Sequence, residues 1–299
     1  MAGAYESWFL SARDTARPRG LWIRHTRLRP PGGAESPALW CTVFDPDAGR
    51  PAAVKESGRG APASRAAFRG EARAGGHRAA WAIQLTGGEP PLRHLRPRAL
   101  YRLPLPRTKL ESPLPDGVAT GRVEVDGRRL PLAGWRATVG RNWGTAHAGR
   151  WAWIHAADLD GAPEAWLELA LARVQVAGAQ TPWLATGALA VGGRRLPLGG
   201  PHRPARVLAA PGTLEARVRG AGVRLAVAVR ADLAQTVAFR YADPAGGGHD
   251  VLHAALAEVH LRVRRRGRPA LELATAHGGA YELGGVGSHD VPLQPYPDP

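Results

Sequence analysis

Hydrophobic and polar residues alternate with a period of two in many short segments of the chain. In the first third these segments cover residues 5–12, 21–28, 39–44, 52–56, 66–74 and 78–85. Side chains of a β-strand point alternately to its two faces, so this alternation predicts strands with one buried face. Turns rich in glycine and proline separate the segments, and no βαβ rhythm is visible. The pattern therefore predicts an all-β, antiparallel protein.

Two hairpins follow an irregular, proline-rich stretch at residues 90–115, which we expect to be a crossing loop. The first hairpin covers residues 121–132 and turns at Asp126-Gly127, a pair suited to a type I′ turn. The second covers residues 187–198 and matches the first at a constant offset of 66. The match indicates either a duplicated domain with equivalent hairpins or the recurrence of a common hairpin pattern.

The last third continues the same pattern at residues 214–218, 223–229, 237–241, 253–263 and 271–276. Residues 251–260 fit either a strand or a helix. A chain of 299 residues is long for one compact domain and comfortable for two. We expect an N-terminal β domain at 1–178 and a C-terminal β domain at 179–299, and the position of the boundary is defined to within about 20 residues.

Composition narrows the functional classes. The only cysteine, Cys41, lies in an apolar run, which excludes a disulfide scaffold and favours a reducing compartment. Neither a signal peptide nor an apolar run of membrane-spanning length is visible, so we expect a cytoplasmic protein with no integral membrane segment. The net charge of +15 is almost all arginine. The arginines are dispersed except for a cluster at 262–268, which is typical of a solvated hairpin turn, so we expect no nucleic acid as partner.

The densest candidate chemistry lies at Gly134–His155, which contains four of the ten tryptophans. Alternation places Trp151, Trp153 and His155 on one face of a strand. Two indoles and an imidazole on one face can form an aromatic wall with one polar handle around an apolar ligand. The alternative is a packed barrel core in which His155 is hydrogen-bonded to the backbone.

Several polar residues accompany this wall. Arg141, Asn142 and His147 lie near Gly140 and Gly144, where they can form a pocket rim or simply cap a turn. Glu6 alternates with Trp8, and Glu168 alternates with Trp166. A carboxyl beside an apolar wall has a raised pKa and can protonate an alkene, although such residues are more often surface or salt-bridged groups. Metal-ligand spacings, phosphate-binding loops and dinucleotide fingerprints are missing, so we expect no metal and no cofactor.

The segment Gly134–His155, with its Gly-Trp, Asn-Trp-Gly and Arg-Trp-Ala-Trp-Ile-His elements, resembles the central signature of a two-domain lipocalin-like superfamily. That superfamily includes tocopherol cyclases, carotenoid 1,2-hydratases, AttH-like proteins and lipocalin-like Diels–Alderases. The resemblance implies two calycin-type β domains around an apolar cavity, in which isoprenoid- or polyketide-like substrates are cyclised, hydrated or isomerised without a cofactor. We expect ligand binding by the tryptophans and polar residues of this segment and by one later indole: Trp135, Arg141, Asn142, Trp143, Trp151, Trp153 and Trp166.

One residue departs from the family pattern. Related sequences usually have His or Asp where this chain has Arg141, and arginine cannot donate a proton near neutral pH. The catalytic role would then fall to His147, His155 or Glu168. Three hypotheses follow: a cofactor-independent cyclase, hydratase or isomerase; a non-catalytic carrier of a hydrophobic small molecule; and a basic nucleic-acid or anionic-surface binder. The sequence indicates no oligomeric state.

Overall fold

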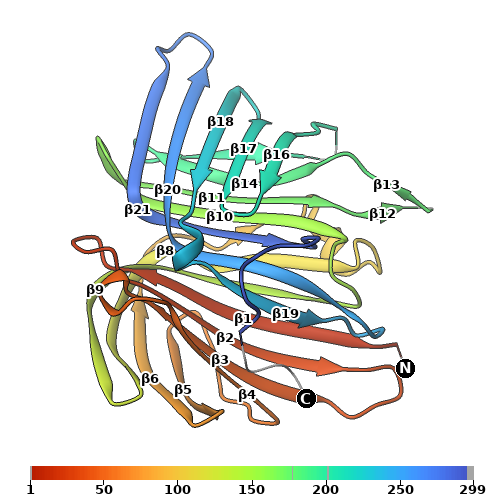
Figure 1. The fold of residues 1–299 in the computed structure, drawn as a ribbon. Coiled ribbons are helices and arrows are strands. Elements are labelled where there is room, and N and C mark those ends of the chain that lie inside the picture. Colours follow the sequence, from red (N-terminus) through yellow and green to blue (C-terminus); the bar gives the residue numbers. More distant parts are fainter. Residues whose placement is uncertain (1, 177, 201, 295–299) are drawn as a thin grey trace. The chain divides into compact units, whose positions relative to one another are not determined.

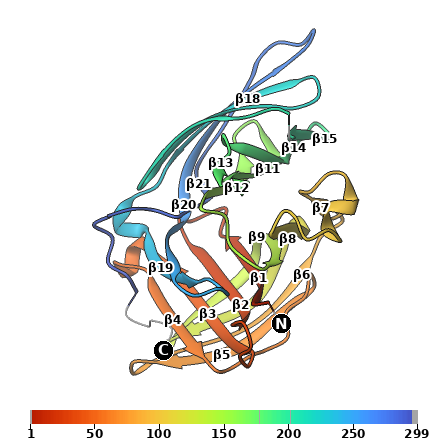
Figure 2. The same ribbon diagram turned by 90° about the vertical axis from the view of Figure 1, so that its right-hand side faces the viewer.

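The computed structural model describes residues 2–176, 178–200 and 202–294 (Figures 1 and 2). The chain divides into two compact units. Unit 1 comprises the described residues of Met1–His147, Val237–His249 and Pro292–Pro299, and unit 2 comprises those of Ala148–Thr236 and Asp250–Val291. Both units are built from antiparallel strands, which confirms the all-β prediction. No helix in the described part of the chain has the length and apolar character of a membrane span.

Unit 1 contains one sheet that nearly closes on itself. Its strand order is β4-β3-β2-β1-β9-β8-β6-β5, with β7 paired to β8. The edge strands β4 and β5 contact each other, so few backbone groups at the edges remain exposed. Its strands are β1 (Ala4–Arg13), β2 (Gly20–Arg29), β3 (Ser36–Phe44), β4 (Ala52–Ser57), β5 (Ala67–Ala74), β6 (His77–Thr86), β7 (Leu92–Arg93), β8 (Thr108–Val125) and β9 (Arg128–Gly144).

Unit 2 is built on a second sheet, in the order β15-β14-β11-β10-β21-β20-β18-β17-β16. Its strands are β10 (Arg150–Leu159), β11 (Ala162–Arg173), β14 (Leu184–Val191), β15 (Arg194–Gly199), β16 (Arg206–Ala210), β17 (Thr213–Arg219), β18 (Val223–Arg230), β20 (Gly248–Arg265) and β21 (Leu271–Gly284). The short strands β12 (Gln175–Val176) and β13 (Ala179–Gln180) form a separate ribbon. Three single-turn 3₁₀ helices complete the regular structure: η1 (Pro46–Ala48), η2 (Arg98–Tyr101) and η3 (Leu233–Gln235).

The two units share one strand order. In each sheet the first four strands form an antiparallel meander that ends at one edge of the sheet. The later strands fill the other half of the sheet, and the last of them pairs with the first strand. The hairpins that match at an offset of 66 also share their internal register, with Gly121 opposite Leu132 and Gly187 opposite Leu198. They occupy different places, however: β8–β9 ends unit 1, whereas β14–β15 supplies the third and fourth strands of its meander in unit 2. The hypothesis of equivalent hairpins is therefore wrong.

A different pair of contacts marks equivalent places in the two units. Phe9 on β1 lies opposite Gly140 on β9, and Trp151 on β10 lies opposite Gly284 on β21. A Cβ atom at either glycine would collide with the facing aromatic ring. Glycine therefore lets an aromatic side chain lie directly over the strand where the first and last strands meet.

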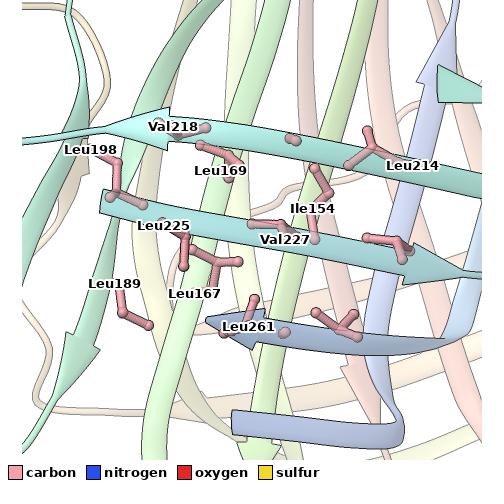
Figure 3. Close-up of a cluster of buried hydrophobic side chains, with 14 of the residues drawn as sticks. Ile154, Leu167, Leu169, Leu189, Leu198, Leu214, Val218, Leu225, Val227 and Leu261 are labelled. Atoms are coloured by element: carbon pink, nitrogen blue, oxygen red, sulfur yellow. The ribbon is translucent and has the colours of Figure 1, made fainter. Parts of the chain in front are cut away.

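Each unit has its own apolar core on one face of its sheet. In unit 1 alternate residues of β1, β2 and β3, such as Leu10, Ile23 and Cys41, are fully buried. Cys41 is a free thiol that packs as a small hydrophobe, and burial raises its pKa. In unit 2 the core is almost purely aliphatic; Figure 3 shows Ile154 and Leu169 near Leu225 and Val227. The cores come from the period-two positions that the sequence pattern identifies.

The chain passes from unit 2 back to unit 1 at Val237, re-enters unit 2 at Asp250 and joins unit 1 again at Pro292. The strand β19 (Val237–Ala242) belongs to unit 1 and pairs with β20. Its Phe239 ring stacks on Trp22 with centroids 5.2 Å apart and meets Trp40 edge-on at 5.4 Å. The guanidinium of Arg24 lies 3.7 Å from the ring centroid of Tyr241. This strand therefore covers aromatic and cationic side chains that belong to the first strands of the chain.

Strands β8 and β20 include residues for which the sequence pattern predicted a loop or left two alternatives open. The stretch at residues 90–115 is a crossing segment only to residue 107, because β8 begins at Thr108. Pro113 and Pro115 lie where β8 shifts register against β9, and such irregularities tolerate a residue that lacks an N–H donor. Residues 251–260, which fit either a helix or a strand, belong to strand β20.

Candidate functional site

The tryptophan-rich strand β10 presents two chemically different faces. Ala152, Ile154 and Ala156 belong to the aliphatic core of unit 2. Trp151, Trp153 and His155 therefore share the opposite face, as the period of two requires. Trp153 is 6% exposed, His155 is completely buried, and their rings are stacked with centroids 6.1 Å apart.

The neighbouring strand β11 brings a carboxyl group to this face. Glu168 lies directly opposite His155 in the strand register and is also completely buried. The indole Nε1 of Trp153 donates a hydrogen bond of 3.2 Å to its Oε1. A carboxyl, an imidazole and an indole thus meet on adjacent strands.

A second carboxyl and a second imidazole come from the other side of β10. Glu282 on β21 lies opposite both Trp153 on β10 and His253 on β20. The indole of Trp151 donates a hydrogen bond of 2.9 Å to Glu282 Oε1, and His253 Nδ1 lies 3.5 Å from Glu282 Oε2. Four adjacent strands therefore build one face of two carboxyls, two imidazoles and two indoles, which we call the proton-transfer face.

This composition is suited to general acid–base chemistry. Carboxyl and imidazole groups are the side chains that most often donate or accept protons during catalysis. Burial disfavours the charged form of an isolated group, and hydrogen bonds between neighbours restore part of that cost. Indole rings next to the acid offer a negative π face to a developing cation. The geometry of the face can serve proton transfer to an apolar molecule once the face is uncovered.

Another group of predicted residues lies in unit 1 and has a different character. Arg141 on β9 donates from Nε to Glu6 Oε1 at 2.8 Å and from Nη1 to Glu111 Oε1 at 3.3 Å. Its guanidinium lies 5.3 Å from the Trp8 ring centroid and 4.5 Å from that of Trp143. Glu6 also accepts a 3.1 Å hydrogen bond from the Trp8 indole. Each carboxyl here forms an ion pair with the Arg141 guanidinium.

The remaining predicted residues do not join either group. Trp135 is a core residue of unit 1, and Asn142 lies on the face of β9 opposite to Arg141. The His147 ring lies 4.1 Å from that of Tyr5, and its backbone N–H donates to Asp243. Trp166 is buried under the Arg195 guanidinium at 5.0 Å from the ring centroid. The structure therefore divides the predicted site residues between the two units.

Sequence reasoning missed His253 and Glu282. Both lie about a hundred residues after β10 and reach it only because the last strand of unit 2 pairs with the first. A weak signal exists in Tyr281-Glu282-Leu283, where a lone carboxylate interrupts an apolar strand. Alternation predicts Trp166 on the same strand as the indole beside Glu168, and the structure adds Trp153 on β10 as a hydrogen-bond donor to this carboxyl.

A hollow of about 780 Å³ lies elsewhere in unit 2. Its lining includes Trp183, Val207, Ala216, Val227 and Leu261, and none of the residues predicted as site residues. Its position therefore does not coincide with the proton-transfer face. The described residues contain no group of three or more histidine, cysteine, aspartate or glutamate side chains placed to hold a metal ion.

Comparison with known proteins finds likeness in structure. No protein-family model and no curated protein matches the sequence. A protein from Nitrosomonas europaea assigned as AttH is 18% identical with a TM-score of 0.54, covering 94% of this chain and 92% of its own. Kievitone hydratase from Nectria haematococca is 10% identical with a TM-score of 0.52, covering 93% and 88%. CghA is 13% identical with a TM-score of 0.62, covering 94% and 87%.

At these identities the likeness establishes the fold, and it extends over nearly the whole of each chain. Function resides in sites and not in folds, so the activity of a neighbour does not transfer by itself. The fold agrees with what the tryptophan-rich segment implies. The chain has an antiparallel, lipocalin-like β fold that it shares with these three solved structures.

Proposed function

We propose that the protein is a hydratase or cyclase that moves a proton to an unsaturated, apolar small molecule at the proton-transfer face. The observation that supports this most strongly is the direct opposition of Glu168 and His155, both fully buried and both beside Trp153. A purely structural ion pair has no need of further polar partners. Here the Glu168 carboxyl also accepts an indole N–H, and a second carboxyl–imidazole pair, Glu282–His253, lies two strands away.

The proposed chemistry is redox-neutral. Glu168 gives its proton to one carbon of a C=C bond, and the other carbon becomes cationic against the indole of Trp153. In hydration, water attacks the cation while His155 accepts a proton from that water, and the proton returns to Glu168. In cyclisation, an internal nucleophile of the substrate takes the place of water. Neither path gains or loses electrons, so we propose that no cofactor takes part.

The substrate must also gain access to the proton-transfer face. Glu168 and His155 have no exposed surface, so a substrate reaches them only when the residues covering them move. Closed sites of this kind exclude bulk water and strengthen electrostatic interactions within them. We therefore propose a substrate that is largely apolar, of the isoprenoid or polyketide class.

The test uses the full chain and a panel of isoprenoid and polyketide polyenes in water labelled with heavy oxygen. Hydration adds one labelled water to the product mass, and cyclisation in heavy water leaves a deuterium on carbon. Glu168→Gln keeps the shape of the side chain but cannot donate an acidic proton, and we expect it to lower turnover about 100- to 10,000-fold.

The matched control is Glu6→Gln, which also removes a carboxyl that accepts an indole hydrogen bond, but in unit 1. We expect turnover within a few-fold of the parent for this variant, with circular dichroism showing that both variants fold. Undiminished turnover in Glu168→Gln would overturn the assignment. Tight binding of a polyene without any conversion would instead favour the carrier hypothesis.

A further inference from the structure

The exposed face of unit 2 on strands β16, β17, β18 and β20 is unusually basic. These strands bury alternate residues in the aliphatic core, so the intervening residues share the solvent side. We call six of the arginines on that side the arginine face: Arg206, Arg217, Arg219, Arg224, Arg262 and Arg264. The strands lie side by side in the sheet order, as Figure 2 shows for the region around β18.

The register brings like charges directly opposite each other. Arg219 on β17 lies opposite Arg224 on β18, and Arg224 in turn lies opposite Arg264 on β20. Arg206 on β16 lies opposite Arg217 on β17. Directly opposite residues in an antiparallel sheet have Cβ atoms about 4.5–5.5 Å apart, and like charges at that separation destabilise the sheet. The arrangement costs folding free energy unless an anion lies against it.

Acidic residues of the chain do not neutralise this row. Arg262 forms an ion pair of 3.1 Å with Glu272. Within the described ranges, Arg206, Arg217, Arg219, Arg224 and Arg264 form no ion pair with any carboxylate. Unit 1 handles the same problem differently: Arg73 and Arg78 are also directly opposite, but Glu71 bridges them at 2.7 and 3.0 Å. The chain thus neutralises one facing arginine pair and leaves the other row open.

We propose that the arginine face docks on the surface of an anionic phospholipid bilayer. Arginines on a broad sheet face match the many phosphate groups of such a surface in charge and in extent. Leu208, on the same side of β16, is 75% exposed and can insert among the headgroups. Arg206, Arg217 and Arg262 also line the hollow of about 780 Å³, with Ala226 and Ala228, which leaves room for a headgroup.

Nucleic acid fits this face less well. Proteins that hold single strands combine basic grooves with aromatic side chains on which bases stack. The solvent side of β16, β17, β18 and β20 carries no Phe, Tyr or Trp, and the described lining of the hollow adds one indole, Trp183, which is too few to stack a series of bases. Docking on lipid also places the protein where apolar molecules dissolve. It does not depend on the catalytic proposal, because a carrier would benefit equally.

The experiment is co-sedimentation of the full chain with vesicles at about 0.1 M salt, where the Debye length is about 10 Å. One set of vesicles is pure phosphatidylcholine, and the other contains one third phosphatidylglycerol. The variant Arg224→Gln/Arg264→Gln removes two members of the row. The control Arg69→Gln/Arg122→Gln removes two exposed arginines of unit 1 that flank Ala82, with the same change in net charge.

We expect binding only to the vesicles that contain phosphatidylglycerol. Each arginine at such a surface contributes about five-fold, so the row variant should bind about 25-fold more weakly and the control within a few-fold of the parent. Equal weakening in both variants would mean that net charge alone matters and would overturn the proposal. So would a lack of preference for anionic vesicles. Tighter binding of duplex DNA or RNA that depends on the row would replace lipid with nucleic acid as the partner.

Discussion

Both units carry a glutamate and a histidine on neighbouring strands, but only in unit 2 do the two lie opposite each other. In unit 1, Glu6 on β1 lies opposite Arg27, and His25 on β2 lies opposite Trp8. In unit 1, Glu6 is tied to the Arg141 guanidinium, and His25 accepts the indole N–H of Trp81 on Nε2 while Nδ1 faces the Ala61 carbonyl. In unit 2, Glu168 and His155 lie opposite each other, and the Trp153 indole donates a hydrogen bond to the carboxyl. The glutamate and the histidine of unit 1 therefore contact separate partners, whereas those of unit 2 adjoin each other.

The difference teaches that a tryptophan beside a carboxyl is not by itself a sign of catalysis. The Trp8–Glu6 and Trp153–Glu168 hydrogen bonds are 3.1 and 3.2 Å long and are chemically alike. The Arg141 guanidinium pairs with Glu6, whereas Glu168 lies opposite the imidazole of His155. Partners of the carboxyl, and not its own neighbourhood in sequence, decide its role.

The largest effect should come from removing the indole of unit 2. Trp153→Ala deletes a side chain that is 6% exposed and hydrogen-bonded to Glu168, so we expect unfolding free energy to fall by about 3–5 kcal/mol. Trp8→Ala removes a half-buried indole and should cost about 1–2 kcal/mol. Urea unfolding of both variants measures the contrast. Equal losses would show that the two clusters are equally important to the core.

A second test concerns the histidine of unit 1. Burial lowers the pKa of His25 to about 4 from its usual 6.5. The unfolded chain binds this proton below about pH 6.5 and the folded chain only below about pH 4, so stability falls as pH drops through that window. The full loss is about 3 kcal/mol.

Urea unfolding at a series of pH values checks this expectation. The variant His25→Gln should remove the dependence between pH 4 and 6.5, because glutamine has no proton to gain there. His202→Gln, at an exposed position, serves as the control and should leave the slope unchanged. A slope that survives in His25→Gln would assign the acid sensitivity to other groups.

The smallest effect is expected for the cation of unit 1. Arg141→Gln removes the bridge between Glu6 and Glu111, whose side chains are 32% and 21% exposed. Ion pairs this close to solvent contribute little, so we expect a loss of less than about 1 kcal/mol, shrinking further at high salt. Thermal unfolding at two salt concentrations measures it. A loss of several kcal/mol would mean that the two clusters are more alike than the contacts indicate.

Much of the fold was visible in the sequence because period-two alternation determines which face of each strand is buried. Leu10, Ala12, Leu21 and Ile23 alternate with polar residues or sit in apolar runs, and they form the core of unit 1 as expected. Alternation also places Trp151, Trp153 and His155 on one face. That these residues act on a ligand stays a prediction.

What the sequence could not show was register between distant strands. Glu168 meets His155 and Trp153 because the β10–β11 turn contains an irregularity at Asp158, where φ is 55°. A shift of one residue would have turned Glu168 to the aliphatic face. Glu282 and His253 depend on closure of the first strand on the last, which no local pattern encodes. The match of two hairpins at an offset of 66 did not identify equivalent positions, because it reflects local turn chemistry and not the pairing of distant strands.

The return of β19 to unit 1 has a consequence for how the chain is made. Phe239 and Tyr241 cover Trp22 and Trp40, yet they are synthesised long after those tryptophans. At about 5–20 residues per second, roughly 10–40 seconds of translation separate the two sets. During that interval the nascent first unit carries two indoles without their final cover. Its completion must wait until much of the second unit has been synthesised, so unit 1 does not mature as an independent product of translation.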